Sequence, residues 1–267
     1  MIKKINCLLK NEEIKEMIYV SNILLSLKKS DVKQQIIDNI LSNIKNMSYY
    51  TLISVISEYK LTYDFRDNNG NTLLIRSCIE DNMDMYISLL VHKLNNPNDI
   101  NNNGYSALHY IAYYSRIQYL IIYSTYTNNF DCTSNDEETP LHISCKYSSL
   151  EFIYIFLNFV ENINPLCNGK TPILIALENN RIDIIKIFLT YRRFNINDII
   201  DKDGNTLLHY SCKLCNNTLL DLLLSMKETK KLNIGILNNF NFSSIYYAYN
   251  MHNTYAYEKL KLLNEEI

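Results

Sequence analysis

The chain has 267 residues, of which 47% are hydrophobic and 20% charged, enough apolar material for a folded protein with a sizeable core. The formal net charge is -2 and Lys and Arg are scattered, which excludes the concentrated basic patch that binds nucleic acid or an acidic membrane. Seven cysteines at irregular spacing argue against a disulfide framework and favour reduced thiols in a cytosol-like compartment.

The first 66 residues are predicted to form helices near 12–27, 31–45 and 48–60. Acidic residues break the apolar patch of MIKKINCLLKNEEIKEM, so this start is a poor secretory signal. No stretch of the chain approaches the roughly 18 uninterrupted apolar residues of a membrane span. We expect 1–66 to be a helical N-terminal cap, in which 31–66 is a degenerate repeat and 1–30 covers its apolar face.

A short string recurs through the rest of the chain, as GNTLLIRSC, GYSALHYIA, ETPLHISC, GKTPILIAL, GNTLLHYSC and, more faintly, NFSSIYYAY. The hydroxyl residues of the strings are separated by 34, 33, 32, 35 and 37 positions: Thr72, Ser106, Thr139, Thr171, Thr206 and Ser243. Over roughly 67–267 this resembles the ankyrin family, whose repeat has a period of about 33 and a T-P-L-H-x-A string.

The resemblance implies an all-α ankyrin-repeat solenoid, made of helix-turn-helix pairs connected by β-hairpins or turns. The expected repeats are 67–100, 101–133, 134–166, 167–200, 201–237 and 238–267.

Glycine placement supports this register, because four of the five glycines precede the hydroxyl residue by two positions: Gly70, Gly104, Gly169 and Gly204. Such a turn needs a positive φ, which Gly supplies without a Cβ clash. Glu137 and Asn241 replace this Gly in the third and sixth repeats, so we expect distorted turns there. The hydroxyl residue is predicted to cap a helix, with Pro140 and Pro172 at the first helical position.

Small side chains five residues after the cap are expected to let neighbouring helices approach closely, except at Ile111: Ser77, Ser144, Ala176, Ser211 and Ala248.

The best candidate for chemistry is HYSCKLC, where His209, Cys212 and Cys215 follow one another at intervals of three. Such a set suggests zinc. A packing role is favoured, because His209 occupies the motif position shared by His109 and His142. By resemblance, these histidines hydrogen-bond within and between hairpins.

The sequence has no phosphate-binding Gly-rich loop, nucleophile elbow or suggestive pair of carboxylates. The acidic string at 135–138 lacks the alternating oxygen ligands and the Gly of a calcium loop, so it is interpreted as a solvated hairpin tip. We therefore expect neither an enzyme nor a bound cofactor or metal.

Function then depends on the surface, and in the ankyrin family the concave face of hairpin tips and first helices binds other proteins. Tyrosines flanked by charges in the second and third repeats have the composition of an interface hot spot, and mixed charges continue the face. The residues expected to contact a partner protein are Tyr105, Tyr113, Tyr114, Asp136, Glu138, Lys146, Tyr147, Lys170, Glu178 and Lys213.

The chain is accordingly predicted to be a monomeric, cytoplasmic protein-binding module without nucleic-acid or membrane partners. Abundant Asn and Ile with scarce Gly and Pro are typical of AT-rich genomes, and resemble the ankyrin proteins of poxviruses, intracellular bacteria or AT-rich protists. The first two settings imply an effector acting on host proteins in the host cytoplasm. The chain ends too early for the ligase-recruiting C-terminal box of many poxviral members, which favours a masking binder. The alternative is a scaffold or assembly chaperone for an endogenous complex.

Overall fold

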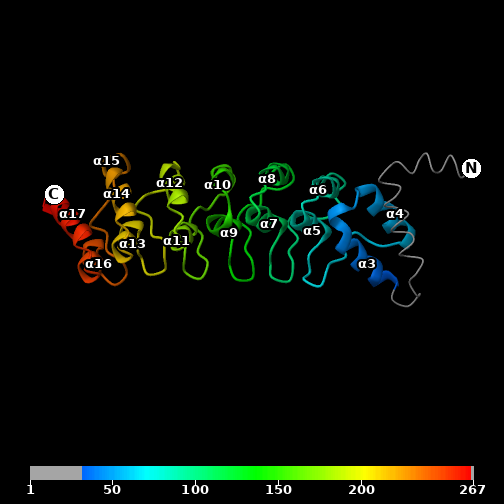
Figure 1. Cartoon of the computed structure of the whole chain (residues 1–267), viewed down its shortest axis with the longest axis horizontal. Coiled ribbons are helices and arrows are strands. Elements are labelled where there is room, and N and C mark those ends of the chain that lie inside the picture. The colour runs from blue at the N-terminus through cyan, green and yellow to red at the C-terminus, as the bar shows by residue number, and fades with distance from the viewer. Residues whose placement is uncertain (1–31, 266–267) are drawn as a thin grey trace, which may run out of the picture. The chain divides into compact units, whose positions relative to one another are not determined.

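A computed structural model describes residues 32–265, and nearly all of their regular structure is helical (Figure 1). The predicted helix near 12–27 lies outside the described residues, whereas those near 31–45 and 48–60 are present. The described helices are α3 (Val32–Asn43), η1 (Ile44–Asn46), α4 (Tyr49–Tyr59), α5 (Leu73–Glu80), α6 (Met83–Val91), α7 (Ala107–Tyr113), α8 (Ile117–Tyr123), α9 (Pro140–Tyr147), α10 (Leu150–Phe156), α11 (Pro172–Glu178), α12 (Ile182–Thr190), α13 (Leu207–Lys213), α14 (Asn217–Ser225), α15 (Lys227–Lys230), α16 (Ser244–Asn250) and α17 (Thr254–Glu265).

The chain divides into two compact units by its internal contacts. Unit 1 takes in the described residues up to 111 together with 116–135, and unit 2 takes in 112–115 and the described residues from 136 onward. This division does not test the predicted boundary at residue 66 or the repeat limits, which stay predictions.

Each predicted cap residue directly precedes a helix, so the register of the repeats is correct from α5 to α16. In unit 2 the first helices of successive repeats pack against one another, α9 on α11 and α13 on α16. The second helices α10 and α12 also meet. The small residues expected at the close approaches are fully buried: Ser144, Ala176, Ser211 and Ala248.

The core of each unit is formed by the apolar residues of these helices. In unit 1 it includes Leu52, Leu74, Leu89, Leu108 and Leu120, and in unit 2 Phe152, Leu174, Phe188, Leu208 and Leu220, none more than 2% exposed. The longest described helices, α3 and α17, have 12 residues. Among residues 32–265, no helix has the length and apolarity required to cross a bilayer.

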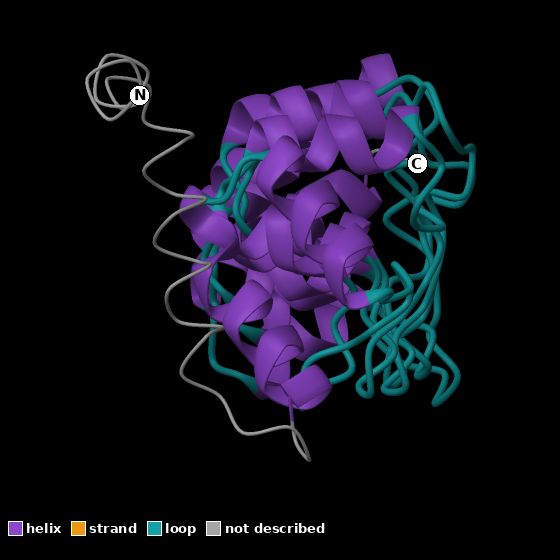
Figure 2. Cartoon of the chain, turned by 90° about the vertical axis from the view of Figure 1, so that its right-hand side faces the viewer, coloured by secondary structure: helices purple, strands orange, loops and turns teal. Residues whose placement is uncertain are grey.

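Hairpin turns precede the first helices and project from the helical layer of their unit (Figure 2). They contain isolated β-bridges, such as Ile100 with Ser106 and Ile199 with Thr206. The four motif glycines have φ between 76° and 83°, as predicted. The expected distortion at Glu137 and Asn241 is wrong, because both adopt the same left-handed conformation with φ of 63° and 61°. The backbone geometry of the turn is kept there despite the Cβ atom.

The fourth hairpin is tighter than the others. Cys167 and Lys170 exchange two backbone hydrogen bonds of 2.9 and 3.0 Å, which leaves two residues at the turn. Those residues, Asn168 and Gly169, have φ of 51° and 77°. Positive φ at both positions is the mark of a type I′ turn, for which Asn-Gly is the favoured pair.

The predicted capping role holds for only some of the hydroxyl residues. The Thr72, Thr139 and Ser243 side chains accept hydrogen bonds from backbone N–H groups of the first helical turn. The prediction is wrong for Thr171, whose hydroxyl donates to the Ile200 carbonyl at 2.9 Å. That bond links the start of α11 to the next hairpin, so the Thr171 hydroxyl does not cap the helix. The first helical residue is Pro172, which has no backbone N–H that needs a hydrogen-bond acceptor.

Candidate functional site

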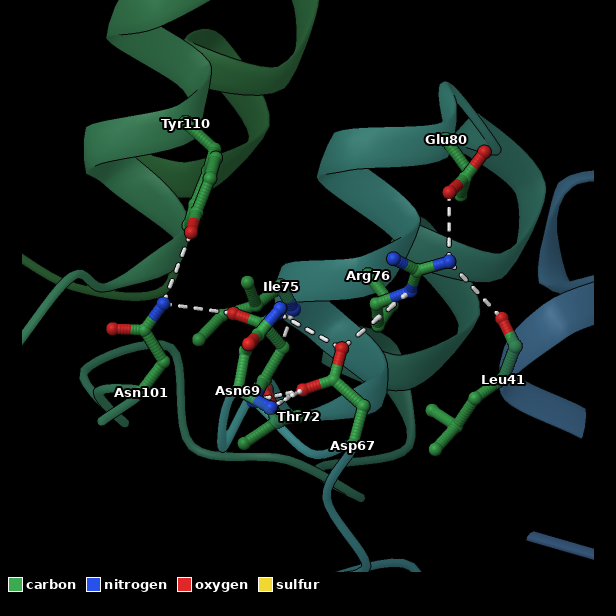
Figure 3. Close-up of polar contacts among 10 residues, drawn as sticks. Leu41, Asp67, Asn69, Thr72, Ile75, Arg76, Glu80, Asn101 and Tyr110 are labelled. Atoms are coloured by element: carbon green, nitrogen blue, oxygen red, sulfur yellow. Dashed lines mark hydrogen bonds and ion pairs between the residues drawn. The ribbon is translucent and has the colours of Figure 1, made fainter. Parts of the chain in front are cut away.

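A ladder of buried and half-buried polar side chains holds the hairpins of unit 1 (Figure 3). The Asp67 Oδ1 atom accepts from the backbone N–H groups of Asn69 and Asn71, at 2.9 and 2.8 Å. In the next hairpin, the Asn101 Nδ2 atom donates to the Asn71 Oδ1 atom at 2.8 Å and to the Tyr110 hydroxyl at 3.0 Å. Each hairpin is therefore closed by its own side chain and tied to its neighbour.

Arg76 joins the first of these hairpins to its surroundings (Figure 3). Its guanidinium donates to the Glu80 carboxylate at 2.7 Å and to the carbonyl of Leu41 at 3.2 Å. Its Nε atom lies 4.0 Å from the Asp67 carboxylate. Arg76 thereby connects α5, the end of α3 and the first hairpin, so the exposed edge of this repeat is held by ionic contacts.

Unit 2 contains a second ladder of the same design. The Asp201 Oδ2 atom accepts from Asn205 at 2.7 Å and from the Tyr210 hydroxyl at 2.9 Å. Asn238 then donates to the Asn205 Oδ1 atom at 2.8 Å and to the Tyr247 hydroxyl at 3.0 Å. These bonds fix Tyr210 and Tyr247 on the surface formed by the first helices.

The motif histidines link successive repeats, as the resemblance implied. The His142 Nδ1 atom accepts from the Thr139 N–H at 3.2 Å, and its Nε2 atom lies 3.1 Å from the Lys170 carbonyl. His209 repeats this arrangement with the Thr206 N–H at 3.2 Å and the Phe242 carbonyl at 3.1 Å. The pattern requires a neutral ring protonated on Nε2.

Burial is the first cause that lowers the pKa of both His142 and His209. Because desolvation disfavours the imidazolium form, these rings are structural connectors in the neutral state.

The structure does not gather His209, Cys212 and Cys215 into a metal site. Both His209 nitrogens contact protein atoms, Cys212 is fully buried and Cys215 is exposed. Burial raises the pKa of Cys212 to about 11, so its thiol is not a ready ligand or nucleophile. No group of three potential metal ligands occurs within the part of the chain that the structure describes.

Three predicted contact residues of unit 2 form one patch, which we call the tyrosine cluster: Tyr113, Tyr114 and Tyr147. The Tyr113 ring centroid lies 5.0 Å from that of Tyr114 and 4.8 Å from that of Tyr147. Their exposed fractions are 45%, 42% and 47%, so the rings pack together and still face solvent. Tyr114 and Tyr147 occupy matching places in adjacent repeats, eight positions after Ser106 and Thr139, and Tyr113 contacts Tyr147 from the neighbouring position.

Lys146 adds a positive charge to the cluster. Its Nζ atom lies 4.9 Å from the centroid of the Tyr147 ring. The pKa of Lys146 is raised, first by its hydrogen bond with the Tyr147 side chain and also by the charge of Glu138. Of the acidic residues predicted on the preceding hairpin, Asp136 is exposed and Glu138 is half-buried.

The remaining charged residues predicted in unit 2 have partners within the unit. Lys170 donates to both oxygens of Glu178, at 2.8 and 2.9 Å. Lys213 lies over the rings of Tyr210 and Tyr247, with Nζ 5.2 and 5.7 Å from the centroids. These cations are thus held in place on the first-helix surface.

Tyr105 belongs to unit 1 and is half-buried. Its ring centroid lies 5.1 Å from that of His109 and 6.1 Å from that of Tyr110. The prediction that it shares a face with the tyrosine cluster joins residues of different units, and it stays a prediction.

The sixth repeat carries an aromatic group that was not predicted from the sequence. The rings of Phe242 and Tyr246 stack with centroids 4.1 Å apart, and Phe240 is 57% exposed. The sequence contained the information needed to predict this group, because Phe240 and Phe242 flank Asn241, the residue in the position of the hairpin Gly. These are the positions that predicted contacts in the earlier repeats.

Comparison with known proteins identifies the repeats. A family model described as ankyrin repeats in three copies matches residues 115–199 and 150–236. Among solved structures, the ankyrin repeat domain of Bcl-3, described as a unique member of the IkappaB protein family, superimposes with a TM-score of 0.64. It is 17% identical, and the match covers 79% of this chain and 90% of that one.

None of the curated proteins matches this sequence. The likeness to Bcl-3 is a likeness of fold, and the predicted poxvirus-like origin has no support in these comparisons. Ankyrin repeats in general mediate protein–protein interaction, and proteins built from them are typically non-enzymatic.

Proposed function

We propose that this chain, which has the ankyrin-repeat fold, is a non-enzymatic module that binds another protein through the first-helix surface of unit 2. The tyrosine cluster carries the proposal. Its three rings come from adjacent repeats, the Tyr113 ring packs against the other two, and all three remain between 42% and 47% exposed. Rings of this kind bury a large area at low entropic cost and offer a hydroxyl group for a hydrogen bond.

Charged residues lie next to the tyrosine cluster, as at a protein–protein interface that has an aromatic centre and a polar rim. Lys146 lies over Tyr147, while Asp136 and Glu138 belong to the preceding hairpin. Central aromatic side chains dominate many interfaces, whereas charged residues at the rim influence orientation and association rate. We therefore expect the rings to contribute most of the affinity and the charges to contribute selectivity.

The test begins with affinity purification of the full chain and mass spectrometry of what it retains. Dissociation constants are then measured with the purified partner. Tyr113→Ala combined with Tyr147→Ala is expected to weaken binding at least roughly tenfold, which corresponds to about 1.4 kcal/mol. Tyr154→Ala is the matched control, because Tyr154 is 67% exposed but lies on the second helix α10.

The melting midpoints of all variants must stay near that of the parent protein, so that lost binding does not merely report lost folding. Equal losses from the double substitution and from Tyr154→Ala would exclude the tyrosine cluster as the contact centre.

The proposal extends to a host-directed effector, with the composition typical of AT-rich genomes as its support. The alternative partner is a complex of the source organism, for which the chain acts as scaffold or assembly chaperone. Parallel purifications from host and source lysates separate the two. A partner that depends on Tyr113 and Tyr147 and occurs only in the source lysate would overturn the effector assignment.

A further inference from the structure

We propose that Asn168 is a site of spontaneous deamidation, the fastest of the three Asn-Gly pairs in the folded chain. The pairs are Asn69-Gly70, Asn103-Gly104 and Asn168-Gly169. They share the same local chemistry and differ in how the hairpin holds the peptide group between the two residues.

The reaction needs only water as a co-reactant. The backbone nitrogen of the Gly attacks the Asn side-chain carbon Cγ, a new C–N bond closes a five-membered succinimide, and the side-chain nitrogen leaves as ammonia with the displaced proton. Water then opens the ring at either carbonyl to give aspartate or isoaspartate, without any change of oxidation state. Gly favours the attack because it has no Cβ to hinder the approach.

The first hairpin locks its Asn-Gly peptide at both polar atoms. The Gly70 N–H donates to the Asp67 carbonyl at 2.8 Å, and the Asn69 carbonyl accepts from the Asn102 N–H at 3.0 Å. The nitrogen cannot turn toward the Asn69 side chain until both bonds break. Gly70 is also buried, which limits the access of water.

The second hairpin is locked in the same way. The Gly104 N–H donates to the Asn101 carbonyl at 2.9 Å, and the Asn103 carbonyl accepts from the Asn135 N–H at 3.0 Å. Gly104 is buried. Both long hairpins therefore protect their Asn-Gly pair through the contacts that define the repeat.

The fourth hairpin leaves this peptide free. Its type I′ turn is closed by the bonds between Cys167 and Lys170, which lie outside the Asn168-Gly169 peptide. Within residues 32–265, neither the Gly169 N–H nor the Asn168 carbonyl has a hydrogen-bond partner. The peptide can rotate from the type I′ to the type II′ arrangement while the closing bonds stay intact, and this rotation moves the nitrogen. Asn168 is exposed, so water reaches it.

The product changes the charge of the unit 2 surface. Cys167, next to Asn168, has its Sγ atom 3.2 Å from the Asp136 carbonyl, so the third and fourth hairpins are in contact. A new carboxylate at position 168 adds to the acidic group of Asp136 and Glu138, and isoaspartate also lengthens the backbone of the turn. Deamidation of Asn168 would thus make the charge of the unit 2 surface, which also includes the tyrosine cluster, more negative.

To test this, the purified full chain is incubated in mildly alkaline buffer. The extent of deamidation at the three Asn residues is measured over time by peptide mapping, which resolves aspartate, isoaspartate and unreacted Asn. In the folded protein, Asn168 is expected to react at least about tenfold faster than Asn69 or Asn103, because two hydrogen bonds must open first at those sites. In urea all three sites are expected to react at similar rates. Asn168→Ser should abolish the early product and leave the two slow sites unchanged.

Equal rates at the three sites of the folded protein would overturn the proposal. So would a difference that persists in urea, because it would arise from the local sequence and not from hairpin hydrogen bonds. Neither result bears on partner binding, so this test stands apart from that of the proposed function.

Discussion

Replacing Asn101 by Ala is expected to destabilise the protein far more than the same change at its neighbour Asn102. Asn101 is 6% exposed and makes four side-chain hydrogen bonds. Its Oδ1 atom accepts from the Asn103 and Tyr105 N–H groups, at 3.0 and 2.9 Å. Its Nδ2 atom donates to the first hairpin and to α7, through Asn71 and the Tyr110 hydroxyl, as described above.

The magnitude follows from the number of bonds and their burial. With a net value of about 0.5–1.5 kcal/mol for each of the four hydrogen bonds, Asn101→Ala should lower the free energy of unfolding by about 2–6 kcal/mol. Asn102 is exposed and its side chain makes one hydrogen bond, to the Asn68 carbonyl at 3.2 Å. Asn102→Ala should cost less than about 1 kcal/mol.

The assay is urea unfolding followed by far-ultraviolet circular dichroism, with the slope against urea compared among the variants. Asn101→Asp serves as a second control, because Asp67 and Asp201 occupy the equivalent hairpin position and accept the same backbone bonds. It should fall between the parent and the Ala variant. If Asn101→Ala costs no more than Asn102→Ala, the polar ladder is not what holds the hairpins.

Two further predictions concern the turns and the histidines. Glu137→Gly should raise the free energy of unfolding by about 0.5–1 kcal/mol in urea titrations, since relief of a left-handed Cβ clash outweighs the greater freedom of Gly in the unfolded chain; a loss of stability would contradict this account. The His142 and His209 pKa values are depressed in the fold, so the unfolded chain binds more protons and the melting midpoint should fall as pH drops below about 6.5. Substituting both by Asn should flatten that dependence, whereas substitution of the exposed His252 should leave it unchanged; the reverse pattern would show that the buried rings are not its source.

The repeat register was predictable because it depends on local backbone chemistry. A Gly such as Gly70 is favoured where φ is positive, and a hydroxyl residue two positions later directly precedes a helix. Each of these two requirements can be recognised from the residue type at one position of the sequence. The left-handed conformation of Glu137 could not be predicted in this way, because the turn keeps its geometry against the preference of the residue.

The polar ladder was not predicted, since Asn in a hairpin normally signals only a turn. Asn71 is 2% exposed and its side chain bonds to that of Asn101. That pairing joins residues of neighbouring repeats. The predicted contact residues are a different case. The period places Tyr147 one repeat after Tyr114, the neighbour of Tyr113, so the proximity of these rings could be inferred from the sequence, but their role in binding stays a prediction.

Comparison of the hydrogen bonds of His142 and His209 shows which segments of a repeat have a constant number of residues and which vary. The same bond joins His142 to a carbonyl 28 positions later and His209 to one 33 positions later. Two residues of the difference lie in the second helix, which has 7 residues in α10 and 9 in α14, and the rest follows it, where the fifth repeat inserts the short helix α15. Between cap and histidine the distance is always three residues. The stretch after each second helix is accordingly where this chain can gain or lose residues over evolutionary time, or accept an engineered insertion, without disturbing the hairpins that follow.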